Sequence, residues 1–188
     1  MNYIKIDDFY NEEELSLIWE ELKFLTYRHK LDPPHKTGQQ NPTMKKNDGI
    51  FLDNVYTDRN MSNILKVNRK TFTKDVMKKY NDLSEMHENI FNCNSDTTLI
   101  SYYENNGFYK SHKDNAVITV LTWFFKEPKM FEGGDLIFSR SEEKIEVKNN
   151  TMIMFPSHLN HQVTAVKMDG KSFSGNGRYC MSQFLSIK

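Results

Sequence analysis

The stretch TTLISYYENNGFYKSHKDNAVITVLTWFF, residues 97–125, decides the fold class. It holds two segments, Thr97–Tyr103 and Val117–Phe125, with the length and the β-branched and aromatic content of strands. The turn signal Asn105-Asn106-Gly107 follows the first of them. The second segment is apolar on both faces, so another layer must cover its outer side.

The C-terminal half continues this pattern of short segments. Turn signals occur at Gly133-Gly134, Asn149-Asn150 and Asp169-Gly170. Gly133-Gly134 indicates a tight turn with positive φ and no chemical role. Seven short strands at this spacing are typical of a sandwich or jelly roll. The candidate strands are Thr97–Tyr103, Val117–Phe125, Asp135–Phe138, Lys144–Lys148, Thr151–Phe155, Gln162–Val166 and Arg178–Ile187.

The N-terminal half, residues 1–96, is predicted to be mainly helical support. After a short strand at Ile4–Ile6, Asn11–Glu14 has the form of a capping box, and a second helical region is expected from Met61 to about Phe91. These amphipathic helices are the expected cover for the major sheet. Between them, Asp32–Gly49 holds three of the five prolines and no periodicity, which predicts a surface loop or a lid over a site.

Composition restricts the class of protein. The chain has 188 residues, 25 basic and 25 acidic, and this balance disfavours nucleic acid or an anionic membrane as the partner. The first residues lack the basic and apolar regions of a signal peptide, and no apolar run is long enough to span a bilayer. We therefore expect a single domain, 1–188, in the cytoplasm. The sequence leaves the oligomeric state open, with a monomer favoured.

Two histidines and one aspartate suggest a metal site. His112 and Asp114 form a His-x-Asp motif in the quoted stretch, and His161 follows 47 residues later. Two imidazoles and one carboxylate are the facial ligand set of non-haem Fe(II) oxygenases. With 6 histidines and 25 acidic residues in 188, chance supplies about one His-x-acid motif, so the motif needs its context.

That context resembles a known family. The order Tyr103 to Asp114, then Gly133-Gly134-Asp-Leu, His161-Gln-Val-Thr-Ala-Val166 and Gly177-Arg178 is similar to the prolyl 4-hydroxylase group of 2-oxoglutarate/Fe(II)-dependent dioxygenases. The resemblance covers about residues 97–188. It implies a mainly β fold with N-terminal helices, in which a double-stranded β-helix, a jelly-roll variant, forms the catalytic core and the supporting helices pack on the outer face of its major sheet.

The resemblance also assigns roles. His112, Asp114 and His161 match the metal ligands, with His158 as a less favoured rival of His161. Arg178 matches the basic residue that binds the distal carboxylate of 2-oxoglutarate, although its spacing from His161 is longer than usual in the family. The remaining matches are Tyr103, Thr119, Leu121 and Trp123 in the cosubstrate pocket and Tyr109 near the substrate entrance. For Thr119, Leu121 and Trp123, plain core packing is an open alternative.

The implied activity is hydroxylation of a peptidyl proline. The resemblance implies Fe(II), 2-oxoglutarate and O2 as metal and cosubstrates, with ascorbate as a further candidate. Two alternatives stay open: a dioxygenase acting on a free amino acid or small molecule, and a non-catalytic jelly-roll binding module. A nucleic-acid demethylase is disfavoured, because Phe184 stands where those enzymes carry a second arginine.

Overall fold

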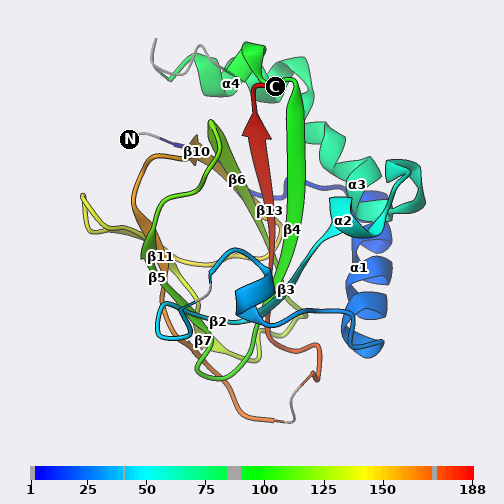
Figure 1. Cartoon of the computed structure of the whole chain (residues 1–188), viewed down its shortest axis with the longest axis vertical. Coiled ribbons are helices and arrows are strands. Elements are labelled where there is room, and N and C mark those ends of the chain that lie inside the picture. The colour runs from blue at the N-terminus through cyan, green and yellow to red at the C-terminus, as the bar shows by residue number, and fades with distance from the viewer. Residues whose placement is uncertain (1–2, 40, 84–89, 171–172) are drawn as a thin grey trace.

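Two antiparallel sheets face each other and helices cover the outer side of the larger one. This computed structural model describes residues 3–39, 41–83, 90–170 and 173–188. Figure 1 shows α1 (Glu12–Tyr27), α2 (Leu52–Val55) and α3 (Asn63–Val67) on one side of the central strands, with the smaller sheet on the other. Within the described ranges, every helix is too short or too polar to cross a bilayer.

The major sheet has six strands in the order β1-β10-β6-β13-β4-β3. All its neighbours are antiparallel, and β13 pairs along most of its length with both β4 and β6. This non-sequential order joins distant parts of the chain. The strands are β1 (Ile4–Ile6), β3 (Asp48–Phe51), β4 (Ser95–Tyr103), β6 (Ile118–Phe124), β10 (Thr151–Pro156) and β13 (Arg178–Ser186).

The minor sheet has five strands in the order β2-β5-β11-β8-β9. A further two-stranded pair joins β7 to β12. Together with the major sheet, these strands form the double-stranded β-helix that the sequence predicted. The strands are β2 (Lys45–Lys46), β5 (Phe108–His112), β7 (Glu132–Gly133), β8 (Leu136–Phe138), β9 (Glu143–Ile145), β11 (His161–Val163) and β12 (Val166–Lys167).

Alternation along the major strands divides the core in two. On β13, Tyr179, Met181 and Leu185 join the apolar cluster beneath the helices, whereas Cys180 joins the cluster inside the barrel. Successive strand residues point to opposite faces, so one strand serves both clusters. The interior cluster lies directly beside the candidate metal residues.

The helical layer begins at the predicted capping box. The Asn11 side chain accepts from the Glu14 backbone N–H, and the Glu14 carboxylate accepts from the Asn11 backbone N–H. The helical region expected from residue 61 to about 91 consists of short segments, and residues 84–89 lie outside the described structure. The segments are η2 (Arg59–Met61), α3, η3 (Asn68–Phe72) and α4 (Lys74–Asn81).

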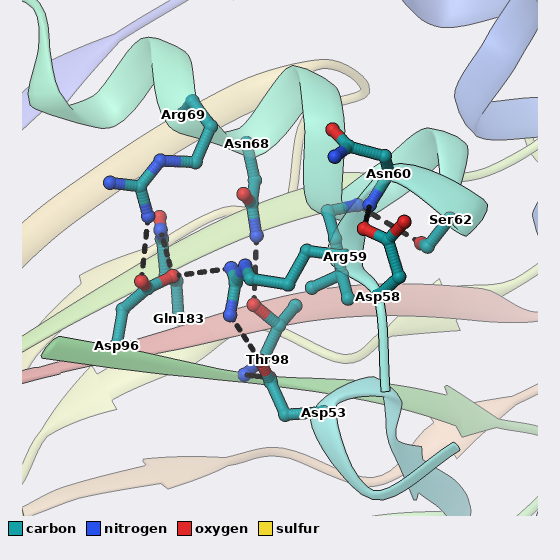
Figure 2. A network of polar contacts seen from close by, with 11 residues as sticks. Asp53, Asp58, Arg59, Asn60, Ser62, Asn68, Arg69, Asp96, Thr98 and Gln183 are labelled. Atoms are coloured by element: carbon teal, nitrogen blue, oxygen red, sulfur yellow. Dashed lines mark hydrogen bonds and ion pairs between the residues drawn. The ribbon is translucent and has the colours of Figure 1, made fainter. Parts of the chain in front are cut away.

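An ion-pair network fixes this layer to the sheet (Figure 2). Asp96, at the start of β4, accepts hydrogen bonds from Arg59, Arg69 and Gln183. Arg59 also pairs with Asp53, whose other oxygen accepts from the Thr98 backbone N–H. The network therefore ties the short helices to β4 and β13 at a distance from the metal residues.

The segment 32–49, expected to be a surface loop or a lid, contains strands and buried residues. It holds η1 (Pro34–Lys36) and β2, and it ends within β3. Lys45 pairs with Tyr109 of β5, and Asp48 pairs with Tyr102 of β4. The expected strand at 162–166 is likewise divided between β11 and β12. Short strands of this kind are fixed by pairing with distant partners, which local periodicity does not reveal.

Candidate metal and cosubstrate site

The minor sheet brings the two histidines together. His112, the last residue of β5, lies directly opposite His161, the first residue of β11. Asp114 follows two residues after His112, and its backbone N–H donates to the Ser157 carbonyl. Ligand atoms of all three side chains lie within 4.8 Å of one another. The structure therefore brings together the three residues predicted as ligands.

The hydrogen bonds of both imidazoles orient Nε2 toward the aspartate. Nδ1 of His112 lies 2.8 Å from the Lys110 carbonyl, and Nδ1 of His161 lies 2.9 Å from the Leu159 carbonyl. A carbonyl can only accept, so each Nδ1 carries the proton and each Nε2 keeps its lone pair. The two Nε2 atoms lie 3.6 and 3.5 Å from the Asp114 oxygens. Three electron-pair donors thus converge on one point, as metal binding requires.

Burial keeps the His112 imidazole neutral. Desolvation and the neighbouring His161 lower the pKa of His112 to about 3. A neutral imidazole is the form that binds a metal. The donor set therefore fits a divalent ion such as Fe(II).

Thr119, predicted as a wall of the cosubstrate pocket, contacts the Asp114 side chain. Its hydroxyl lies 2.7 Å from the Asp114 carboxylate and 2.8 Å from the Ser157 hydroxyl. Thr119 donates to the carboxylate, so the Ser157 hydroxyl must donate to Thr119. This chain of hydrogen bonds holds the carboxylate in place, which assigns Thr119 a supporting position.

Arg178 lies deep in the barrel, where the described residues offer its guanidinium no oxygen acceptor. It is fully buried, and its Nε, Nη1 and Nη2 atoms have no acceptor within the described structure. It pairs directly with Tyr103 across β13 and β4, and its Cζ lies 4.8 Å from the Tyr103 ring centre. A buried guanidinium without an acceptor is costly, so this position fits the carboxylate of an anionic ligand.

The other predicted residues occupy different places. Leu121 lines the metal pocket with Tyr103. Trp123 is fully buried, and its ring centre lies 5.8 Å from Cζ of Arg178. The Tyr109 ring stacks on His112 with 3.5 Å between ring centres. His158, the rival ligand, is exposed in the loop after β10.

Lys45 is a residue of this pocket that sequence reasoning missed. Its ammonium group is buried, donates to the carbonyl and hydroxyl of Thr37, and lies 5.0 Å from the Tyr109 ring centre. Burial lowers the pKa of Lys45 to about 8, and the charge of Asp114 opposes this shift. The sequence around Lys45 does not indicate this role, because Thr37 and Tyr109 contact Lys45 only in the folded chain.

Gly134 also has a role that the turn prediction omitted. Both glycines of the Gly133-Gly134 pair have positive φ, as the sequence indicated. In addition, a Cβ at Gly134 would lie 2.6 Å from Cδ of Arg178. The glycine therefore leaves the space that the arginine side chain occupies.

Comparison with known proteins supports the same family. Residues 98–186 match the model of the 2OG-Fe(II) oxygenase superfamily. A PKHD-type hydroxylase of Crocosphaera subtropica is 33% identical over 78 residues, and one of Acinetobacter baumannii is 33% identical over 82 residues. These matches cover 36% of this chain and 35% and 36% of the relatives, so the chain spans about a third of the length of the curated relatives it matches.

Solved structures agree on the fold. A Pseudomonas putida prolyl-4-hydroxylase has a TM-score of 0.65 at 13% identity, covering 98% of this chain and 92% of its own. A 2OG-Fe(II) oxygenase family oxidoreductase of Burkholderia pseudomallei has a TM-score of 0.64 at 14% identity, covering 98% and 85%. The site presents the two imidazoles and one carboxylate that are the ligand set of non-haem Fe(II) oxygenases. Residues 98–186 are similar to the 2OG-Fe(II) oxygenase superfamily, and the chain shares its fold with a prolyl-4-hydroxylase.

Proposed function

We propose that this chain is an Fe(II)- and 2-oxoglutarate-dependent hydroxylase that acts, as a single domain, on a prolyl residue of a peptide. The proposal rests on one observation: the same barrel holds three converging metal-ligand atoms and a buried guanidinium without an oxygen acceptor among the described residues. His112, Asp114 and His161 present converging donors, and Arg178 presents a guanidinium without an oxygen acceptor among the described residues. A metal and a dicarboxylate together satisfy both.

Each residue has a defined task in this proposal. His112, Asp114 and His161 hold the metal, and Arg178 binds the distal carboxylate of 2-oxoglutarate beside the face of Tyr103. When bound, Fe(II) with 2-oxoglutarate activates O2 and couples decarboxylation of the cosubstrate to hydroxylation. The protein holds the two imidazoles neutral and the aspartate as a carboxylate. It also orients the cosubstrate and excludes water.

The peptide substrate is supported by the relatives rather than by the pocket. One solved relative is a prolyl hydroxylase from Trichoplax adhaerens in complex with a hypoxia inducible factor peptide fragment, at 13% identity and a TM-score of 0.63. Tyr109, which stacks on His112 at the pocket wall, is the proposed contact for the incoming residue. Lys45, whose ammonium group donates to the Thr37 carbonyl, lines the same pocket.

Product analysis tests the activity and its substrate. The purified chain is incubated with Fe(II), 2-oxoglutarate, ascorbate and proline-containing peptides, and succinate and peptide mass are measured. The proposal expects succinate together with a peptide heavier by one oxygen atom. Succinate formed only with free amino acids would show that the substrate is a small molecule. Absence of turnover with every substrate class would contradict the proposed activity.

A further inference from the structure

A second cavity lies behind the metal pocket. It has a volume of about 320 Å³, and its lining includes Lys46 and Tyr102. Their neighbours Lys45 and Tyr103 line the metal pocket instead. Successive strand residues point to opposite faces, so the two cavities lie back to back across β2 and the end of β4. Their linings share no described residue.

Buried polar atoms without partners mark this cavity as they mark the cosubstrate position. In the part of the chain that is described, such atoms gather at two places. One is Arg178 with Trp123 Nε1. The other is Asn47, whose Nδ2 and Oδ1 both lack partners, with Oε1 of Glu104, and these two residues line the second cavity. The remaining atoms of this kind are single atoms of Tyr10, Arg59, Asn68 and Asn81.

The Asn47 amide is the strongest of these signals. Its side chain belongs to a residue only 6% exposed, so bulk water does not satisfy it. Leaving both a donor and an acceptor buried and unpaired is costly, and native proteins place a partner, an ordered water or a ligand there. A cavity bordered by this amide is therefore built to receive polar atoms.

The charges around the cavity favour a cation. Asp48 lies directly opposite Tyr102 across the β3–β4 pair, on the face that lines the cavity, and Glu104 follows β4. Only one cation, Lys46, balances these two carboxylates within the described lining, and it donates to the Asn105 carbonyl. Burial and the charge of Glu104 raise the pKa of Asp48, as expected for a carboxylate that lacks a cationic partner.

The apolar lining of this cavity indicates which kind of cation fits it. Pro34, Met168 and Phe173 supply apolar surface beside the carboxylates. A bare divalent ion would gain nothing from these walls, since it binds oxygen atoms. A planar guanidinium on an aliphatic stem matches both parts, because it offers five donors in a fixed fork and its stem packs on apolar groups.

We infer that this cavity is a binding site for a guanidinium group on an aliphatic stem, as in arginine. Glu104 and Asp48 accept its N–H donors, and the Asn47 carbonyl oxygen accepts a further one. The site is separate from the metal pocket, and its occupancy requires neither metal nor 2-oxoglutarate. The group can come from free arginine or from an arginine residue of a peptide.

Calorimetric titration of the whole metal-free chain tests the inference. The probes are L-arginine, its neutral isostere L-citrulline, and the blocked peptide acetyl-Gly-Arg-Gly-amide. We expect arginine to bind at least about tenfold more tightly than citrulline, and Glu104→Gln to weaken arginine binding about tenfold. The exposed carboxylate variant Glu13→Gln is the control and should bind as the wild type does. Peptide binding as tight as that of arginine assigns the site to a peptide residue, whereas binding of free arginine alone assigns it to the amino acid.

Several results would overturn the inference. Equal binding of arginine and citrulline would exclude recognition of the charge. No binding of any probe at millimolar concentration would mean that the cavity holds water only. Binding of Ca²⁺ that Glu104→Gln abolishes, without any binding of arginine, would make it a metal site. Thermal unfolding of Glu104→Gln checks its fold, and if that variant unfolds, the isosteric Asp48→Asn variant provides the same test.

Discussion

Gly134 leaves the space in which the Arg178 side chain lies. A methyl group at this position would lie 2.6 Å from Cδ and 3.3 Å from Nε of Arg178. The approach matters because Arg178 is the proposed anchor for the distal carboxylate of 2-oxoglutarate. The turn after β7 and the start of β13 thus determine together where the guanidinium can lie.

Gly134→Ala should therefore weaken cosubstrate binding. The added Cβ displaces Arg178, so we expect the apparent KM for 2-oxoglutarate to rise about tenfold or more while metal affinity stays unchanged. The matched control is Gly170→Ala, which also has positive φ but nothing within 4 Å of its Cβ position. An unchanged KM in Gly134→Ala would contradict the proposed role of Arg178.

Thr119→Val should weaken metal binding. The substitution keeps the side-chain shape but removes the hydroxyl that donates to Asp114. Loss of such a supporting contact typically costs 10–100-fold in metal affinity, and we expect about this loss in a competitive Fe(II) or Co(II) titration. Thr122→Val, at a buried position of the same strand, should bind metal as the wild type does. Equal affinity of both variants would show that Thr119 does not support the ligand.

Asp96→Asn should destabilise the fold. The Asp96 side chain is 6% exposed and pairs with both Arg59 and Arg69 (Figure 2), so the change removes the carboxylate of Arg69 and leaves Arg59 with Asp53 alone. We expect the free energy of unfolding in denaturant to fall by about 2–4 kcal/mol. Asp82→Asn, which breaks an exposed pair with Lys78, should change it by less than about 0.5 kcal/mol. A change in Asp96→Asn as small as in this control would contradict the importance of the network.

Lys45 should give the metal-free protein a characteristic pH dependence. Burial lowers its pKa from 10.5 to about 8. Between these values the unfolded chain holds a proton that the folded chain has released, so stability due to this group rises with pH. The unfolding free energy of the wild type relative to Lys45→Met should therefore increase from pH 8 to 10.5, by up to about 3 kcal/mol.

The neighbouring residue provides the control for this measurement. Lys46 is exposed, so the wild type relative to Lys46→Met should show little change over the same range. A flat difference for Lys45→Met would mean that its ammonium group is not buried. A decrease with rising pH would mean that a nearby negative charge dominates its environment.

The sequence predicted the central elements because their signals are local or were recognised as a family pattern. The long strands β4, β6 and β13 follow from their apolar content, and the capping box from four consecutive residues. The ligand pattern His112, Asp114 and His161 needed the surrounding motif to separate it from chance. The helices expected as cover do lie against the major sheet.

What the sequence could not predict depends on pairing between distant segments. β2, β3 and β5 are short, and their partners lie elsewhere in the chain, so no local period identifies them. For the same reason the sequence did not identify Lys45, which lies in the segment predicted as a loop or lid. Gly134 was interpreted as a turn residue, since its closeness to Arg178 arises only when β13 joins the sheet.

The most direct test of the central claim is anaerobic addition of Fe(II) and 2-oxoglutarate to the protein, followed by visible absorption. The account predicts the weak charge-transfer band of the metal-bound cosubstrate in the wild type and its loss in His161→Ala. A folded wild type that develops no band, or a His161→Ala variant that keeps the full band, would contradict the proposed site.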